Sequence, residues 1–331
     1  MLYYYALLYY NINLKQIKTM KKIHLISTLI GLLAFSTISK ADLKVVTSIK
    51  PIHSLASYIM DGVGSPGLIV DGYNSPHSFQ LKPSHAKMLE QADIIFWIGE
   101  DLENFLEKPL ATIAKKAEKI ELLEIKGIKK LKFRERNIFE EHEGHDDHGD
   151  DAKKEEHDDH DDHGHGEYDP HIWLDPINAK VILNEITEHL IENDSKNAAT
   201  YKSNLAKAIS EIDKLIIDVI TETNTDLSYV VFHDAYQYYE NRFNVNILGA
   251  MTVNPDVMPG AEQIHEIHEV IEHDNVSCIL SEPQFNPDII KSIAKDTSVK
   301  TGVLDPLGAN LKPGKDLYFD LIRNMSASFN C

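Results

Sequence analysis

Positively charged residues are scarce in this chain of 331 residues, which has 33 lysines and arginines against 52 acidic residues and a formal net charge of −19. Proteins that bind nucleic acids contact phosphates through clustered lysine and arginine, so the composition argues against that class. The acidity is mostly local, because residues 135–169 contain sixteen acidic and three basic residues. The remainder has the composition of an ordinary, mildly acidic globular protein.

Long hydrophobic runs are lacking as well. The apolar run Ile23–Phe35 has thirteen residues, fewer than the roughly 20 that a transmembrane helix needs. Two lysines precede this run, and the small residues Ser39 and Ala41 follow it, which is the pattern of a secretory signal. We therefore predict that residues 1–41 are a signal peptide, with Met20 as an alternative start, and that the mature protein is soluble in the periplasm. No cysteine lies directly after the run, so no lipid anchor is expected.

Cysteine occurs twice, as Cys278 and Cys331. In the oxidising periplasm, two such residues are more often bonded to each other than free. A bond between them would close a loop of about fifty residues, which contributes roughly 4 kcal/mol to stability on the chain-entropy model. It would also link the end of the last predicted helix to a strand predicted at 276–280. The alternative is a pair of reduced thiols.

Glycine and proline are both missing from residues 195–223. The apolar residues of this segment recur at intervals of three and four: Tyr201, Leu205, Ala208, Ile212, Leu215 or Ile216, and Val219. This spacing predicts a single amphipathic helix of roughly 40 Å, which would form a stiff connection. A flexible linker would instead be rich in glycine and serine.

Short apolar runs alternate with helix-length amphipathic segments on both sides of this helix. Such alternation is typical of parallel-sheet α/β folds. We therefore predict two Rossmann-like α/β lobes, at 42–194 and 225–331, joined by the long rigid helix at 195–224. Strands are predicted at 43–49, 67–70, 93–99, 120–125, 229–234, 245–251, 276–280 and 299–305.

The segment 135–167 is rich in acidic residues, histidine and glycine, and has almost no apolar residues. Because it cannot bury a core, we predict a disordered loop within the first lobe. Its histidines are His142, His145, His148, His157, His160, His163 and His165. Their composition favours weak, adaptable binding of divalent metal ions over one defined site. The alternative is a solvated acidic linker with incidental histidines.

Three other histidines occupy a different kind of position. His77 follows the strand predicted at 67–70 after a short turn, His233 lies at the end of another predicted strand, and His171 lies just after the loop. Ligands of open α/β sheets bind beyond the carboxyl ends of the strands. We therefore predict a metal site formed by these side chains, with Asp305, which ends the last predicted strand, as a further candidate.

Six segments, in this order, resemble the ZnuA-like periplasmic zinc-binding proteins of ABC importers. They are SPHSFQLKPS (75–84), DPHIWLDP (169–176), FHDAYQYYENRF (232–243), NPDVMPGAEQIHEI (254–267), SEPQFNP (281–287) and LDPLGANL (304–311). The similarity extends over essentially the whole chain after residue 41. An acidic, histidine-rich loop before DPHIW is typical of the zinc-binding branch. The resemblance implies two lobes joined by a rigid helix, with the metal held in the cleft between them.

The resemblance also implies which residues bind the metal and which form the disulfide. The metal ligands fall on His77, His171 and His233, with Asp305 as a candidate fourth ligand. The disulfide falls on Cys278 and Cys331.

Two positions bear on the identity of the metal. Manganese-binding relatives tend to have a glutamate at the position of His233, and three imidazoles suit zinc better than manganese. Copper and nickel would accept the same ligands. Pro76 departs from the family pattern, because zinc-binding members often have an acidic residue there. The fourth ligand is therefore expected to be Asp305, water or a loop histidine.

These observations predict a monomeric periplasmic binding protein, not an enzyme, that captures Zn²⁺ and delivers it to an inner-membrane ABC permease with its ATPase. The histidine-rich loop would gather or sense zinc. The alternatives are a transport protein for manganese or another divalent metal, a metal buffer or adhesin, and a zinc hydrolase. A hydrolase would need a general base such as Glu282. The segment HEIHE (265–269) lacks the His-Glu-x-x-His spacing of zinc proteases.

Overall fold

The computed structural model describes residues 42–134, 136–139, 166–253, 255, 257 and 259–331. Residues Leu43–Cys331 form one compact unit. The predicted signal peptide and the seven loop histidines lie outside the described residues. Within the described part of the chain, no helix combines the length and the hydrophobicity needed to cross a bilayer.

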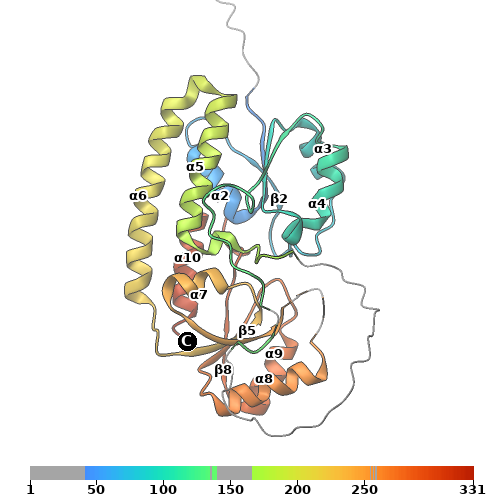
Figure 1. Cartoon of the computed structure of the whole chain (residues 1–331), viewed down its shortest axis with the longest axis vertical. Helices are drawn as coiled ribbons and strands as arrows, with labels where there is room; N and C mark the ends of the chain where they lie inside the picture. The colour runs from blue at the N-terminus through green and yellow to red at the C-terminus, as the bar shows by residue number, and fades with distance from the viewer. Residues whose placement is uncertain (1–41, 135, 140–165, 254, 256, 258) are drawn as a thin grey trace, which may run out of the picture. The chain divides into compact units, whose positions relative to one another are not determined.

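A four-stranded parallel sheet with strand order β2-β1-β3-β4 forms the first half of the fold (Figure 1). Its two central strands, β1 and β3, are buried at every position, as expected for parallel strands that are covered on both faces. The elements in chain order are β1 (Val45–Ile49), α2 (Lys50–Ile59), β2 (Gly67–Val70), α3 (Pro83–Gln91), β3 (Ile94–Trp97), α4 (Glu100–Thr112) and β4 (Glu118–Glu121).

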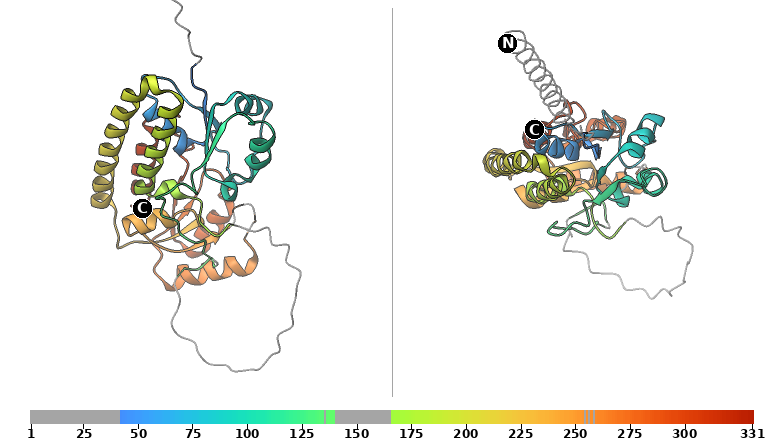
Figure 2. Two further views of the ribbon diagram at one scale, coloured as in Figure 1. Left: turned by 45° about the horizontal axis from the view of Figure 1, so that its top comes forward. Right: turned by 90° about the horizontal axis from the view of Figure 1, so that it is seen from above.

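The long predicted helix is α6 (Ala198–Glu222), which follows η1 (Ile172–Leu174), α5 (Pro176–Asn193) and η2 (Ser195–Asn197). Its 25 residues correspond to a length of about 37 Å. Tyr201, Ala208, Ile212, Leu215 and Val219 form its buried face, as the spacing predicts. This face packs against α5, α2 and α10, and Figure 2 shows α5 and α6 side by side in both views.

A second four-stranded parallel sheet, with strand order β6-β5-β7-β8, forms the other half. Its elements are β5 (Ser228–His233), α7 (Gln237–Phe243), β6 (Asn246–Thr252), α8 (Ala261–His273), β7 (Cys278–Ser281), α9 (Asp288–Thr297), β8 (Lys300–Val303) and α10 (Leu317–Ser328). The two parallel sheets and the long helix confirm the predicted fold class.

Side chains of β5 point alternately to two separate cores, because successive residues of a strand face opposite sides of the sheet. Val230 and Phe232 belong to a small cluster of buried residues that also includes residues of α8 and α9. Tyr229 and Val231 belong to the large core that includes residues of the first sheet. His233 continues the second set, so its side chain lies on the face of the sheet directed toward the rest of the protein.

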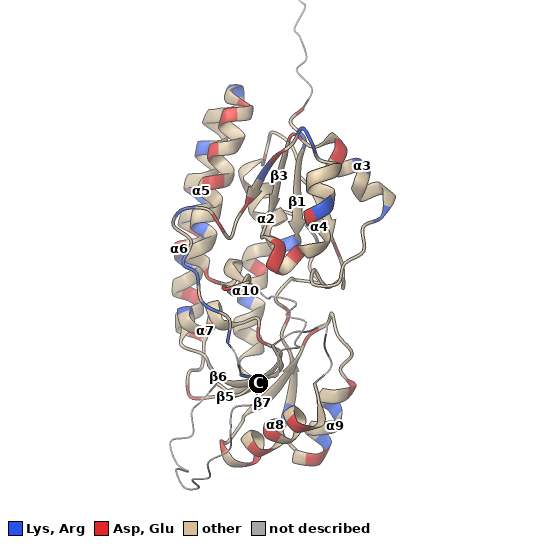
Figure 3. Cartoon of the chain, turned by 45° about the vertical axis from the view of Figure 1, so that its right-hand side comes forward, with Lys and Arg blue, Asp and Glu red and all other residues tan. Residues whose placement is uncertain are grey.

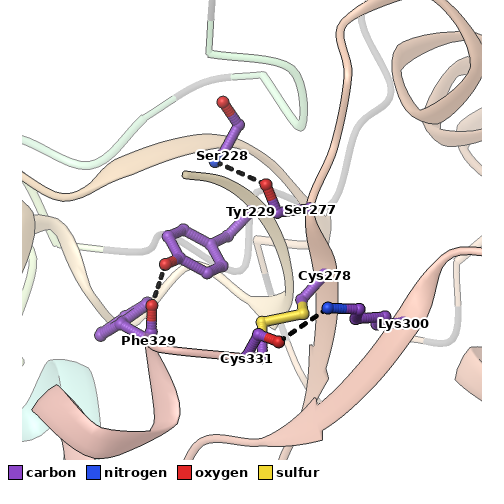
Figure 4. Close-up of a disulfide and its surroundings, with 7 residues drawn as sticks. All are labelled: Ser228, Tyr229, Ser277, Cys278, Lys300, Phe329 and Cys331. Carbon is purple, nitrogen blue, oxygen red and sulfur yellow. Dashed lines mark hydrogen bonds between the residues drawn. A yellow bond between two sulfur atoms is a disulfide. The ribbon is translucent and has the colours of Figure 1, made fainter. Parts of the chain in front are cut away.

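The last helix, α10, packs against α2 and α6, although the sequence prediction placed residues 225–331 together in the second lobe. A disulfide joins Cys278, the first residue of β7, to Cys331 beyond the end of α10 (Figure 4). The predicted pairing of the two cysteines is therefore confirmed. Near this bond, the Tyr229 hydroxyl donates a hydrogen bond to the carbonyl oxygen of Phe329, so a second contact ties the chain end to the sheet.

Charged side chains lie mainly on the helices and turns; both signs occur along α4 and α9, whereas α8 has glutamates but no lysine or arginine (Figure 3). The central strands β1 and β5 contain no lysine, arginine, aspartate or glutamate. Buried ionisable side chains are therefore exceptions to this pattern, and three of them, Asp169, Asp234 and Glu282, lie next to buried histidines.

Candidate metal centre

His77, His171 and His233 converge, although they are far apart in the sequence. One ring nitrogen of each lies within 4.8 Å of a ring nitrogen of the other two. The ring centroids are 5.2 to 5.6 Å apart. His171 and His233 are buried, and His77 is partly exposed. The three side chains that the sequence predicts as metal ligands therefore lie together.

The position of each histidine follows from the local fold. His233 is the last residue of β5, and His77 lies in the loop after β2, so both follow the carboxyl ends of parallel strands. His171 immediately precedes the short helix η1, which is held by the fully buried Trp173. The Trp173 indole donates to the carbonyl oxygen of Pro306 at 2.9 Å, and the Tyr318 hydroxyl donates to the carbonyl oxygen of Trp173 at 2.8 Å.

Two buried carboxylates orient two of the rings. Nδ1 of His171 lies 2.7 Å from Oδ1 of Asp169, and Nδ1 of His233 lies 2.6 Å from Oε1 of Glu282. A carboxylate accepts the Nδ1 proton, so the Nε2 atom of each neutral ring carries the lone pair. The two Nε2 atoms are 3.3 Å apart. Tetrahedral zinc with Zn–N bonds of 2.0–2.1 Å requires a nitrogen separation of about 3.3 Å.

The two buried histidines have pKa values shifted in opposite directions. Burial, with a smaller contribution from the charge on His233, holds the pKa of His171 well below 6.5. Burial also lowers the pKa of His233, but the charge and hydrogen bond of Glu282 and the charge of Asp234 outweigh it, so the pKa of His233 is raised. Burial raises the pKa of Asp169 to about 7, against the opposing hydrogen bond from the backbone of His171.

Further charged groups, buried or partly buried, lie next to the histidines. Arg134 donates to Asp234 at 3.0 Å and to both carboxylate oxygens of Glu240 at 3.1 and 2.7 Å. Burial raises the pKa of Asp234 to about 6 and that of Glu240 to about 7, despite the opposing effect of Arg134. Around Arg134, His171 and His233 there are thus more carboxyl groups than cations.

A small pocket of about 10 Å³ lies between the three histidines, close to the space that one water molecule requires. Trp173, Phe285, Pro306 and Leu307 form its apolar walls. A site of this size suits a single ion better than an organic molecule, since pockets for drug-sized ligands occupy at least about 300 Å³.

Asp305 is not part of this group of ligand atoms. Its carboxylate accepts hydrogen bonds from the backbone N–H groups of Leu307, Gly308 and Ala309 at 3.1, 3.0 and 2.6 Å. The side chain of Gln284 donates a fourth bond at 3.0 Å. Asp305 therefore shapes the loop after β8, and it would have to give up some of these bonds to bind a metal.

Glu282 is the residue that the sequence offers as the general base of a hydrolase. It lies at the site, but its carboxylate is hydrogen-bonded to Nδ1 of His233. His265 of the HEIHE segment is exposed and pairs with Glu269 on the same helix. The sequence analysis missed the roles of Asp169, Glu282 and Arg134. The only local signal was the presence of Asp169 two residues before a predicted ligand.

A second group of ligand-type side chains lies on the first half of the fold. Glu118 of β4 and His189 and Glu192 of α5 bring their polar atoms within 4.8 Å of one another. His189 Nδ1 is 2.8 Å from Glu118, and His189 Nε2 is 3.2 Å from Glu185. Glu118 and His189 are partly buried and Glu192 is exposed, and acidic groups at a surface commonly occur together without a metal.

Two parallel sheets with a small, histidine-lined pocket beyond the carboxyl ends of their strands define a class of two-lobed α/β metal-binding proteins. Comparison with known proteins agrees with this class. The family model described as "Zinc-uptake complex component A periplasmic" matches residues 45–330. The chain belongs to this ZnuA family.

Relatives named "High-affinity zinc uptake system protein ZnuA" include one from Brucella abortus (strain 2308), which is 45% identical over 300 residues, covering 86% of this chain and 90% of the relative. The Yersinia pestis protein of the same name is 36% identical over 303 residues, covering 90% and 94%.

Solved structures with the same fold include one described as "Crystal structure of ZnuA", with a TM-score of 0.68 and 21% identity, covering 87% of this chain and 100% of that one. A mutant of the laminin-binding adhesin Lmb from Streptococcus agalactiae has a TM-score of 0.69 and 22% identity, covering 87% and 98%. At these identities the likeness establishes the fold alone.

Proposed function

We propose that this protein is the periplasmic binding component of a zinc importer, and that it captures one Zn²⁺ ion with His77, His171 and His233. The observation that carries the proposal is the convergence of the three imidazoles, with two Nε2 atoms 3.3 Å apart. Relatives at 34–45% identity are named as zinc uptake proteins, which favours uptake over adhesion or hydrolysis.

The donor set supports zinc as the ion. Three neutral imidazoles suit zinc, whereas manganese prefers oxygen ligands. The carboxylates of Asp169 and Glu282 increase the basicity of the rings they contact. Together with Asp234 and Glu240, they outnumber the single guanidinium of Arg134 and so favour a divalent cation in the pocket. The fourth ligand is then water, a loop histidine, or Asp305 after it releases its backbone bonds.

Delivery follows from the way the ion joins different parts of the protein. His77 follows the first sheet and His233 ends a strand of the second, so a bound ion connects the two halves of the fold. A permease that binds the loaded form more tightly than the metal-free form would select it for transport. We assign this role to an inner-membrane ABC permease with its ATPase. The histidine-rich loop would raise the local concentration of zinc near the pocket.

Calorimetric titration with zinc, manganese and copper tests the proposal. The samples are the native protein, His171→Ala, a variant lacking residues 140–165, and the control His265→Ala, which changes an exposed histidine. We expect one tight zinc site in the native protein, in the loop deletion and in the control, and loss of that site in His171→Ala. Tight binding that survives in His171→Ala but disappears with the loop would overturn the assignment.

A further inference from the structure

Lys50 is a buried lysine with an unusual set of partners. It is the first residue of α2, directly after β1, and its side chain is 3% exposed. Its Nζ donates to the carbonyl oxygens of Ala309 at 3.0 Å and Leu311 at 2.7 Å, and it lies 3.7 Å from Oδ1 of Asp71. Lysine is almost never fully buried unless it is paired. These three oxygens provide the pairing, and the segments they belong to indicate what Lys50 does.

The partners of Lys50 belong to two segments that border the histidine pocket. Asp71 directly follows β2 and begins the His77 loop, which we define as residues 71–77. Ala309 and Leu311 belong to the segment 305–311 after β8. A second contact joins the same two segments, because the Tyr73 hydroxyl donates to Oδ1 of Asn310.

Segment 305–311 is in turn fixed to the frame that holds the other two histidines. Trp173, two residues after His171, donates to the carbonyl oxygen of Pro306. Gln284, two residues after the Glu282 that contacts His233, donates to Asp305. A continuous series of contacts, namely the Lys50–Asp71 ion pair and the hydrogen bonds of Lys50 and of segment 305–311, therefore connects the His77 loop to the neighbourhoods of His171 and His233.

We propose that Lys50, assisted by Tyr73, is a positioning residue that holds His77 against His171 and His233 and thereby slows the release of the ion. This inference rests on the proposed function. His77 is the one partly exposed member of the three, so the ion leaves most easily when His77 withdraws. Lys50 does not contact the ion, and its effect depends on His77.

A double-mutant cycle tests this dependence. Lys50→Met keeps the length of the side chain and removes its charge and donors. It is made in the native protein and in His77→Ala, and zinc affinity is measured by chelator competition, with dissociation followed by stopped flow. In the native background we expect an affinity loss of about tenfold, as for other residues that orient metal ligands, with a matching rise in the dissociation rate. In the His77→Ala background the loss should be less than about twofold.

Two further variants keep the experiment decisive. Tyr73→Phe changes a side chain that is 56% exposed, so it folds even if Lys50→Met does not, and it should weaken binding by about two- to fivefold, the effect of one hydrogen bond. Lys315→Met removes the exposed ion pair with Asp61 and should change nothing. With Co²⁺ in place of zinc, the absorption spectrum of Lys50→Met should approach that of His77→Ala.

The outcomes separate this proposal from the proposed function. Equal losses in both backgrounds, or no loss for Lys50→Met and Tyr73→Phe, would overturn the positioning role alone. If His77→Ala itself left zinc affinity unchanged, the three-histidine site would be wrong, and the role of Lys50 would fail with it.

Discussion

The Nε2 atoms of His171 and His233 face each other at 3.3 Å. Each ring presents its Nδ1 atom to its own buried carboxylate, Asp169 or Glu282. When both rings are neutral, their Nε2 lone pairs repel each other, and a cation between the two nitrogens removes that repulsion. The pocket is therefore built in advance for a cation.

Glu282→Gln should weaken zinc binding without unfolding the protein. The amide keeps an oxygen that accepts the Nδ1 proton of His233 but loses the negative charge that increases the basicity of the ring. Outer-shell substitutions of this kind cost about 10- to 100-fold in metal affinity. Chelator competition measures the loss, and Glu266→Gln, an exposed change on α8, is the matched control. Equal affinities for the two variants would show that Glu282 does not support the site.

Zinc affinity should also fall as the pH drops, and His233 should determine where the fall begins. A protonated imidazole has no lone pair for the metal. The pKa of His171 lies well below 6.5, so His171 stays neutral as the solution is acidified, whereas the pKa of His233 is raised. Of these two rings, protons therefore compete first at His233. Below its pKa, we expect the affinity to fall by about tenfold per pH unit, as for competition by one proton.

Glu282→Gln provides the internal check on this pH dependence. The charge of Glu282 is the largest of the effects that raise the pKa of His233. Without it, burial dominates, the pKa of His233 falls, and the loss of affinity should begin at a lower pH. Dissociation constants measured from pH 8.5 to 5.5 give the two curves. An unchanged midpoint in the variant would contradict the assignment of the titrating group to His233.

The fold and the three histidines could be predicted because their signals are local. Buried parallel strands appear as short apolar runs, and the carboxyl ends of such strands are where ligands bind. His77 and His233 follow that rule directly. The strand predicted at 120–125 shows the limit of the same signal. The observed strand β4 ends at Glu121, and the apolar Leu122 and Leu123 bury their side chains in the turn that follows.

The supports of the site could not be predicted, since they depend on pairing between distant segments. Glu282 is 49 residues from His233 in the sequence, and Arg134 is 100 residues from Asp234. Asp305 shows the converse case. An acidic residue at a strand end is a reasonable ligand on sequence grounds, but the turn after β8 directs three backbone N–H groups at its carboxylate. Only the folded backbone reveals that competition.

Glu103 should make the stability of the metal-free protein depend on pH in a way that does not involve the histidines. Burial raises its pKa to about 7 from 4.5, although hydrogen bonds from Ile98 and Gly99 oppose the shift. The folded state therefore binds a proton more tightly than the unfolded state. The cost of burying the charge is complete above pH 7 and is relieved as the pH falls toward 4.5.

Glu103→Gln removes that titration and keeps an oxygen for the two backbone donors. The free energy of unfolding of Glu103→Gln minus that of the native protein should be roughly 3 kcal/mol larger at pH 8 than at pH 4.5, since each pKa unit corresponds to about 1.4 kcal/mol. Urea unfolding at the two pH values measures the difference. Glu107→Gln, an exposed change on the same helix, should show no such dependence. A constant difference between Glu103→Gln and the native protein would contradict the raised pKa.

Reduction of the disulfide should lower stability but leave zinc binding intact. Cys278 and Cys331 are 53 residues apart in the sequence, and closing a loop of that length contributes roughly 4 kcal/mol. Cys278 is the first residue of β7, and Glu282 directly follows the last residue of that strand. At the rise of a strand, the two residues are about 13 Å apart. Urea unfolding with and without a phosphine reductant measures the stability, and chelator competition measures the affinity. Cys331→Ser should be insensitive to the reductant. A parallel loss of zinc affinity on reduction would mean that the bond also holds the carboxyl end of β7 in place.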